Sequence, residues 1–442
     1  MQGSNLRRPL MLSAILGAAM MSSHLAAADP VAASDADVAA LTLESAVRKA
    51  VAWHPSVDQA IGGLNERGED VKEARAGYSP QISGGVGSNL EISGGSSWRP
   101  RTTLSGSQMI YDFGKVASSV ATAEASVRVS RAQLLVAVDN LVRNTAYAVV
   151  EVQRNRALLA VARDQLTSLR AIDKLVHYRT ERGASTRSDA LQAEARVQSA
   201  EATILQITAE LHRWESNLRH LVGSDRPVDV TEDVPGWYGQ ACSAATPDWE
   251  RVPAMMQYEA QREEALARYN RSKADSMPTL SLGADVGADV RDPFSNRSEV
   301  TVGFTLSSSL YQGGATRARR DGARYALQTA EAALAATRVE VGRNLGEARE
   351  QISSLMDMIA TLGLRQEMMR ETGKLYRLQY FEMGTRTLLD LLNAEQELHQ
   401  VRFDQVNAIH DVRRLNTDCL YNSGSTRDSF ALTGMTLRGV TL

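Results

Sequence analysis

Apolar residues recur at three- and four-residue steps along two very long stretches of the chain, 115–182 and 315–383. This spacing places the apolar side chains on one face of a helix. The first stretch contains no proline and no glycine, and as one helix it would be about 100 Å long at 1.5 Å per residue. The second carries a strict seven-residue repeat at Leu327, Leu334, Val341, Ala348, Leu355 and Leu362. A sustained heptad predicts helices that supercoil against their neighbours.

A different period precedes each long stretch. Apolar and polar residues alternate along 280–290 and 300–310, and less regularly along 81–93 and 101–111. Alternation with a period of two predicts β-strands, and about ten residues is the length that a tilted strand needs to cross a bilayer. The sequence therefore predicts two pairs of antiparallel strands.

The junctions between helical and alternating segments repeat as well. Pro80 and Pro278 end the helical patterns that precede the strands, because the residue before proline is pushed to extended geometry. The strands end at Tyr-Asp-Phe-Gly114 and Tyr-Gln-Gly-Gly314, which match at an offset of 200 residues. We therefore predict helix–strand junctions at these four residues.

Each long helix is predicted to end in a tight helical hairpin. Gly384 has the position of a left-handed helix stop, and Thr387 with Asp390 has the spacing of a capping box that starts a new helix. The same spacing occurs about 200 residues earlier, at Gly183, Thr186 and Asp189. The chain is thus interpreted as a duplication with two hairpin tips.

The first residues are typical of a secretory signal peptide, with Arg7 and Arg8 before a short apolar run and an Ala-Ala-Ala site at 26–28. Residues 224–248 are rich in proline and glycine and are interpreted as a linker at mid-height of the helices. The predicted organisation is a signal peptide at 1–28, a first repeat at 29–223 (helices 41–77, 115–182 and 186–222), the linker at 224–248, a second repeat at 249–421 (helices 249–275, 315–383 and 387–421) and a polar tail at 422–442.

Four strands cannot close a barrel, and an open sheet edge is not tolerated in lipid. Several copies would have to pool their strands: two copies give a narrow eight-stranded barrel and three give a wider, twelve-stranded one. The alternative is a soluble sandwich with a coiled-coil appendage, but two isolated hairpins would form a poor core. We therefore expect a mixed α + β membrane protein, in which a long helical barrel continues into a small transmembrane β-barrel.

The composition excludes several classes of function. Aromatic residues make up only 5% of the chain, which is low for a chain that packs several compact cores. A mildly acidic, exported chain argues against nucleic acid as a partner. The seven histidines show no metal-ligand spacing, and neither a nucleophile arrangement nor a phosphate-binding loop is visible, so we expect no enzyme activity and no cofactor. Cys242 and Cys419 are candidates for a disulfide in an oxidising compartment.

The duplicated layout and the segment Gly384-Thr-Arg386-Thr-Leu-Leu-Asp390-Leu-Leu-Asn393-Ala-Glu resemble TolC-family outer-membrane channel proteins along nearly the whole mature chain. The resemblance implies a homotrimer in the outer membrane of a Gram-negative bacterium, with a twelve-stranded barrel in contact with lipid and a long periplasmic helical tunnel. It also implies that the hairpin tips, with Gly183, Gly384, Thr186 and Thr387, dock onto a periplasmic adaptor protein and an inner-membrane transporter.

The resemblance carries individual residues too. Asp390 matches a carboxylate that narrows the periplasmic entrance, whereas Asn393 stands where some members have a second aspartate. Arg386 matches an arginine that in some members pairs with the aspartate equivalent to Asp189 and holds the entrance shut. Capping of a helix N-terminus is the competing interpretation of both aspartates.

The expected function is a passive exit duct, because the chain has no nucleotide site of its own. Type I protein secretion with an ABC transporter is slightly favoured by the segment that begins at Gly384, and multidrug efflux with a proton-driven pump is the alternative. A periplasmic coiled-coil scaffold without a pore is the alternative from another class.

Overall fold

The computed structural model describes residues 40–91, 97–243, 247–289 and 299–442. The expected signal peptide at 1–28 lies outside the described residues, as do the last residues expected in two strands, 92–93 and 290. Residues 40–442 form one compact unit.

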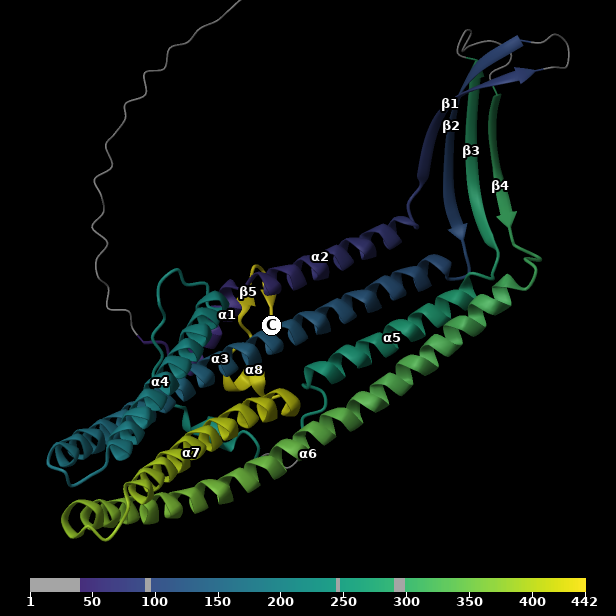
Figure 1. The fold of residues 1–442 in the computed structure, drawn as a ribbon. Coiled ribbons are helices and arrows are strands. Elements are labelled where there is room, and N and C mark those ends of the chain that lie inside the picture. Colours follow the sequence, from purple (N-terminus) through teal and green to yellow (C-terminus); the bar gives the residue numbers. More distant parts are fainter. Residues whose placement is uncertain (1–39, 92–96, 244–246, 290–298) are drawn as a thin grey trace, which may run out of the picture. The chain divides into compact units, whose positions relative to one another are not determined.

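The unit is built around α3 (Lys115–Glu181), an unbroken helix of 67 residues that packs against helices from both halves of the chain. Its counterpart in the second half is α6 (Ala315–Leu378), a helix of 64 residues. Shorter helices flank both, and the strands continue from the end opposite the hairpin tips (Figure 1). The remaining α-helices are α1 (Leu43–Trp53), α2 (Pro55–Ala76), α4 (Arg187–Leu221), α5 (Pro253–Ala274), α7 (Leu388–Ser423) and α8 (Thr426–Ser429).

Prolines mark the starts of two helices. The sequence indicates a helical segment at 41–77 with a break risk at His54-Pro55, and the helix breaks there: His54 ends α1, and Pro55 is the first residue of α2. The segment expected to start at 249 becomes helical only at Pro253. The reason is the same in both places: proline has no N–H to donate, so it is tolerated in the first helical turn but breaks a helix interior.

Four antiparallel strands form one sheet in the order β1-β2-β3-β4. The central pair, β2 and β3, joins the two halves of the chain, whereas β1 and β4 are the edge strands. The strands are β1 (Gln81–Glu91), β2 (Ser97–Tyr111), β3 (Thr279–Asp289) and β4 (Glu299–Ser307).

The register gives the sheet two different faces. Leu104 pairs with Val286, and Val286 pairs with Val300, so the even-numbered residues of all four strands share one face. That face is apolar and open, and carries Ile82, Val86, Leu104, Leu282, Val286, Val300, Val302, Phe304 and Leu306. Ile82, Val86 and Phe304 are 76%, 76% and 72% exposed. The opposite face carries mainly small and polar residues, among them Ser83, Thr103, Ser105, Ser281, Thr301 and Thr305.

The helix–strand junctions differ between the halves. Gly114 and Gly314 both have left-handed backbone angles, with φ of +89° and +86°. Asp112 caps the start of α3, because its carboxylate accepts hydrogen bonds from the N–H groups of Gly114 (2.9 Å) and Val116 (2.6 Å). The matching Gln312 instead accepts from the Arg319 side chain at 2.8 Å. Pro80 and Pro278 directly precede β1 and β3.

The largest core lies where α1, α3 and the linker meet the C-terminal residues. The side chains of Tyr238, Phe430 and Leu432 are fully buried there. The expected polar tail at 422–442 is therefore wrong as a description: these residues include α8 and the strand pair β5 (Thr436–Leu437) and β6 (Val440–Thr441). The tail folds back because the burial of its few apolar residues in this core is favourable.

The linker is held to α7. Its short 3₁₀ helix, Gly236–Gln240, carries Tyr238, whose hydroxyl donates to the carbonyl of Arg413 at 2.8 Å. Cys242 and Cys419 form a disulfide, with their Cα atoms 5.2 Å apart. The carbonyl of Cys242 also accepts a hydrogen bond from Arg349 of α6 at 3.2 Å, so the linker bridges α6 and α7.

Candidate functional site

The two hairpin tips are the candidate site. In the first, α3 ends at Glu181, Gly183 has φ of +74°, and α4 begins after Thr186. In the second, α6 passes through a π-helical turn, Gln379–Met383, before Gly384 takes φ of +63°. Glycine suits both turns because left-handed angles strain any residue that has a Cβ.

A capping box starts the second helix of each tip. In the first tip, the N–H of Asp189 donates to the Thr186 hydroxyl at 3.1 Å, and the N–H of Thr186 donates to the Asp189 carboxylate at 3.1 Å. In the second, Thr387 and Asp390 exchange the same bonds at 3.2 and 3.3 Å. Both aspartates thus satisfy free N–H groups at a helix start.

Asp189 is also bound by the hydroxyl of Ser185, which donates to its carboxylate at 2.9 Å. Partial burial opposes ionisation of this carboxyl, but the hydrogen bonds from Thr186 and Ser185 outweigh it and hold the pKa of Asp189 below its usual value. Asp189 therefore carries a full negative charge at neutral pH.

Arg386 does not meet Asp189 within the chain. Its guanidinium lies over the ring of Tyr376, 4.6 Å from the centroid, and donates to Gln379 at 3.3 Å. The nearest carboxylate, that of Asp390, is 4.0 Å away. Asp189 thus lies on the first tip, whereas Arg386 and Asp390 lie on the second. Asn393 is exposed on the second turn of α7.

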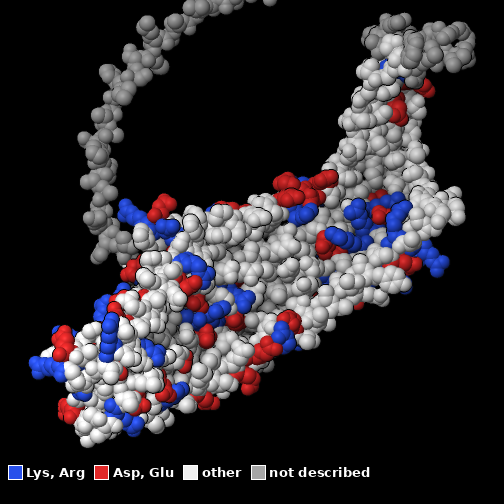
Figure 2. Space-filling view, viewed as in Figure 1, with Lys and Arg blue, Asp and Glu red and all other residues white. Residues whose placement is uncertain are grey.

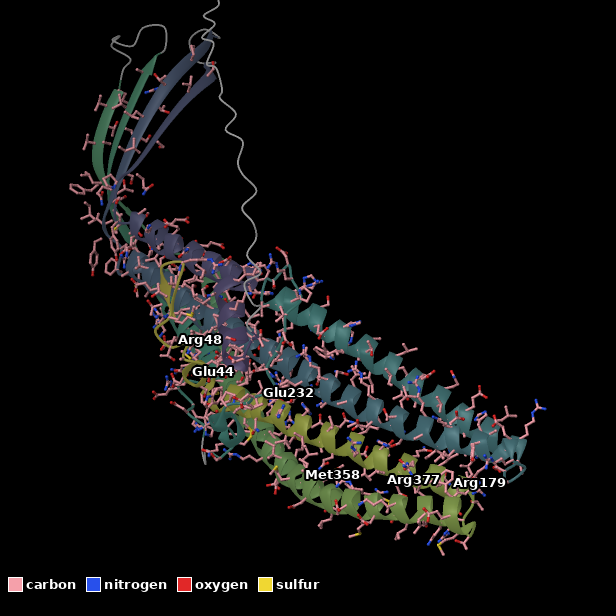
Figure 3. All side chains as sticks on the ribbon, turned by 90° about the vertical axis from the view of Figure 1, so that its left-hand side faces the viewer. Glu44, Arg48, Arg179, Glu232, Met358 and Arg377 are labelled. Carbon is pink, nitrogen blue, oxygen red and sulfur yellow. A yellow bond between two sulfur atoms is a disulfide. The ribbon has the colours of Figure 1, made fainter. Side chains whose placement is uncertain are left out.

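Arg179, near the end of α3, connects the two tips. Its guanidinium donates to the carbonyls of Phe381 (3.1 Å) and Ala184 (3.3 Å), and it lies 5.1 Å from the ring centroid of Tyr380 (Figure 3). Sequence reasoning missed this residue. Its partners are mainly backbone carbonyls about 200 positions away, which leave no local signal in the sequence.

A small apolar core supports the tips. Tyr380 is buried against residues of α3 and α4, and its hydroxyl lies 3.5 Å from that of Ser185. Phe381 has no hydroxyl group, but the neighbouring Tyr380 brings a phenol to the first tip. Other members of this core are Leu169, Ile172, Val176, Ala190, Ala193, Leu388, Leu391 and Leu392.

A groove of 690 Å³ lies between the tip ends of α3 and α6. The lining combines apolar side chains with four cationic ones and one carboxylate, and two of the cationic residues, Arg179 and Arg377, are seen at this end in Figure 3. The lining consists of Leu175, Tyr178, Arg179, Arg182, Ala184, Lys374, Arg377, Leu378, Phe381 and Glu382. Two of its cations are paired within the chain, Lys374 with Glu371 and Arg377 with Glu395.

Neither a metal centre nor a helical membrane span is present in the described part of the chain. No group of three or more histidine, cysteine, aspartate or glutamate side chains among the described residues could hold a metal ion. None of the described helices combines the length and the apolar composition needed to cross a bilayer.

Several known proteins are similar to this chain in sequence or in fold. BepC, an outer membrane efflux protein of Brucella suis, is 25% identical over 395 residues, which cover 84% of this chain and 82% of BepC. AprF, an alkaline protease secretion protein of Pseudomonas aeruginosa, is 27% identical over 274 residues, 57% of this chain and 55% of AprF. The crystal structure of VceC, an outer membrane protein of Vibrio cholerae, superposes with a TM-score of 0.76 at 19% identity, over 86% of this chain and 96% of that one.

The family model described as "Outer membrane efflux protein" matches residues 46–224 and 249–415, which is most of the chain. The two matched segments correspond to the two halves of the duplication, on either side of the linker. The fold is that of outer-membrane channel proteins with a large helical periplasmic portion. The chain therefore belongs to the TolC family of outer membrane efflux proteins.

Proposed function

We propose that the protein is the passive outer-membrane exit duct of a tripartite export system, formed by three copies of the chain. Three four-stranded sheets would close a twelve-stranded barrel, and the long helices would continue it as a tunnel through the periplasm. Energy for transport would come from an inner-membrane transporter.

The observation that carries this proposal is the sheet. One face is mainly apolar and largely solvent-exposed in the single chain, while the other face carries mainly small and polar residues. Both edge strands have unused backbone groups on one side. Such a sheet is stable in a membrane only if its edges pair with other copies, which removes the edges and turns the apolar face to lipid.

The tips are the proposed contact with the periplasmic partners. The groove beside Arg179 would receive an adaptor protein, and the turns at Gly183 and Gly384 would face the transporter. We further propose that the tips line the entrance of the duct, with Asp189, Arg386, Asp390 and Asn393 near its narrowest point. A ring of three Asp390 carboxylates would attract cations and disfavour anions.

Secreted polypeptides are the proposed cargo, as in type I secretion. The tip segment from Gly384 to Leu398 supports this choice through its resemblance to secretion-type members, and AprF is named for protease secretion. Small-molecule efflux is the second candidate, favoured by BepC, which aligns with 84% of the chain. Deleting the gene and measuring both secreted protein and drug susceptibility separates the two.

The pore itself is tested with purified protein. We expect extraction only with detergent, a trimer by light scattering, and stepwise ion conductance in planar bilayers. A periplasmic scaffold without a pore would instead be extracted without detergent and would give no conductance, and that outcome would refute the proposed duct.

A further inference from the structure

The charged side chains of the sheet lie on one of its faces. The face formed by the even-numbered residues of β1 to β4 carries no charged residue among the side chains that the structure describes. The face formed by the odd-numbered residues carries three of them, Arg101 of β2, Asp285 of β3 and Glu299 of β4, and all three are exposed. Serine, threonine and glycine make up most of the rest of this face, so these charges lie on a wall that is otherwise nearly neutral.

The three residues lie in the part of the sheet that is remote from the helices. β2 runs toward α3 and ends at Tyr111, and Arg101 lies ten residues before this end, about 30 Å along the strand. Glu299 is the first residue of β4. Figure 2 shows the few charged side chains of the sheet gathered toward its end away from the helices. The charged patch is therefore separate from the hairpin tips.

Arg101 reaches Glu299 across the strand between them. Glu299 stands opposite Gly287 of β3, and Gly287 stands opposite Thr103 of β2, so Arg101 is a diagonal neighbour within reach of a long side chain. Its Nη2 atom lies 3.4 Å from the Glu299 carboxylate. A Cβ at position 287 would lie 2.8 Å from the Cζ atom of Arg101, so the guanidinium lies directly on the glycine backbone. Glycine makes this close approach possible.

The pair decides how much charge this face carries. Arg101 neutralises Glu299, whereas Asp285 has no ion-pair partner among the described residues. The three described charges therefore leave one negative charge per chain; two would remain without Arg101 and none without Glu299. An exposed ion pair contributes little to stability, so its effect on the charge of the face is the larger consequence.

We propose that Arg101 sets the charge of the lumen in the outer part of the barrel: it neutralises Glu299 across Gly287 and leaves Asp285 as the unpaired carboxylate of each chain. This inference rests on the proposed duct, in which three polar faces surround the lumen. Rings of carboxylates attract cations and disfavour anions. Arg101 therefore keeps this second charged level weak, far from the proposed entrance, which suits the passage of cargo segments of either sign.

A single thiol on the same face measures this charge directly. The two cysteines of the chain form the disulfide, so Thr301→Cys introduces the only free thiol. Position 301 lies on the same face as Glu299, two residues farther along β4. In outer-membrane fragments, its rates of modification by a cationic and by an anionic methanethiosulfonate reagent are compared. The ratio of these rates depends on the local potential and not on the narrowest point of the duct.

Charge removal should change this ratio in opposite directions. With the thiol at position 301, Arg101→Gln is expected to raise the cation-to-anion rate ratio about threefold and Glu299→Gln to lower it about threefold, since one charge changes in each of three copies about 10 Å away. Arg101→Lys keeps the charge and should stay near the parent ratio. A purely structural role of the pair would instead move both glutamine variants in the same direction.

The glycine that lies under the guanidinium offers a second test with a matched control. Gly287→Ala should raise the ratio, though less than Arg101→Gln, because the new Cβ displaces the guanidinium from Glu299. Gly283→Ala lies on the same strand and the same face, and its Cβ would meet only the carbonyl oxygen of Gly303, at 3.9 Å. We expect this control to keep the parent ratio.

The outcomes separate this inference from the proposed duct. A thiol at position 301 that reacts with neither reagent contradicts the duct, because the polar face would then not line water. A reactive thiol whose rate ratio is the same with and without Arg101 overturns the role of Arg101 alone. Equal effects of Gly287→Ala and Gly283→Ala overturn the contact across Gly287.

Discussion

Asp390 has an observed capping role and a proposed role at the entrance, and substitutions can separate the two. Its carboxylate accepts hydrogen bonds from the N–H and hydroxyl groups of Thr387, and it would also contribute charge to the proposed entrance. Asp390→Ala removes both roles, and we expect a loss of about 1 kcal/mol in stability together with lower cation selectivity. Asp390→Asn keeps an oxygen acceptor but no charge, so it should lower selectivity in planar bilayers with a smaller loss of stability. Unchanged selectivity in both variants would leave Asp390 with the capping role alone.

Asp139 of α3 predicts a pH dependence. The residue is 1% exposed, and its carboxylate lies 3.4 Å from Arg427 of α8 without a hydrogen bond to either oxygen among the described residues. Burial raises the pKa of Asp139 to about 7, and Arg427 only partly opposes this shift. Because an unfolded aspartate has a pKa of about 4, the folded chain binds this proton more tightly. Its contribution to stability is full below about pH 4 and is lost as the pH rises through about 7.

The Asp139→Asn variant tests this dependence, because its amide remains neutral at every pH. As the pH is raised from 5 to 8, we expect the thermal unfolding midpoint of the variant to rise by several degrees relative to that of the parent. All other titrating groups are common to both proteins and cancel in the difference. Parallel pH profiles for the two proteins would show that Asp139 stays charged when folded.

At the scale of elements, turns with similar left-handed backbone angles differ in how well they tolerate an added side chain. Gly424, at the end of α7, has φ of +79°, and an added Cβ would lie 2.8 Å from the backbone of Arg251 and Val252. Gly384, at the tip, has φ of +63° and open space around it. Gly384→Ala should therefore cost only the left-handed strain, about 1–2 kcal/mol.

Gly424→Ala should be more damaging, because backbone atoms cannot move aside as a side-chain end can. We expect a lower unfolding midpoint and a lower yield of folded protein than for Gly384→Ala. Equal midpoints for the two variants would mean that the joint between α7 and the start of α5 is looser than its contacts indicate.

At the scale of the whole molecule, the two faces of the sheet should respond differently to charge. Val302 and Thr301 are neighbours on β4 whose side chains lie on opposite faces. In the proposed barrel, Val302→Arg places a charge in lipid at a cost of about 2–4 kcal/mol near the bilayer midplane, and the amount of folded trimer in the outer membrane should fall. Thr301→Arg should assemble normally and change the conductance. Similar assembly of both variants would contradict the assignment of the apolar face to lipid.

Features that depend on a few neighbouring residues could be predicted from the sequence. The spacing of apolar residues indicated α3 and α6, alternation indicated the strands, and the Gly–Thr–Asp spacing indicated both tips, because helix periodicity, strand pleat and capping act within one or two turns of chain. The helix starts at Pro55 and Pro253 also follow from local chemistry, although the sequence pattern placed the second of them too early, at 249. Resemblance to a family, rather than any single pattern, indicated the function.

Only the tertiary structure decided which distant segments meet. It placed the guanidinium of Arg179 on the carbonyl of Phe381, kept Arg386 away from Asp189 within the chain, and buried Phe430 of the C-terminal residues in the main core. It also fixed the strand register that puts the apolar residues of both halves on one face. These contacts join positions up to several hundred residues apart, and they depend on the packing of whole helices and strands, which the residues next to each position do not encode.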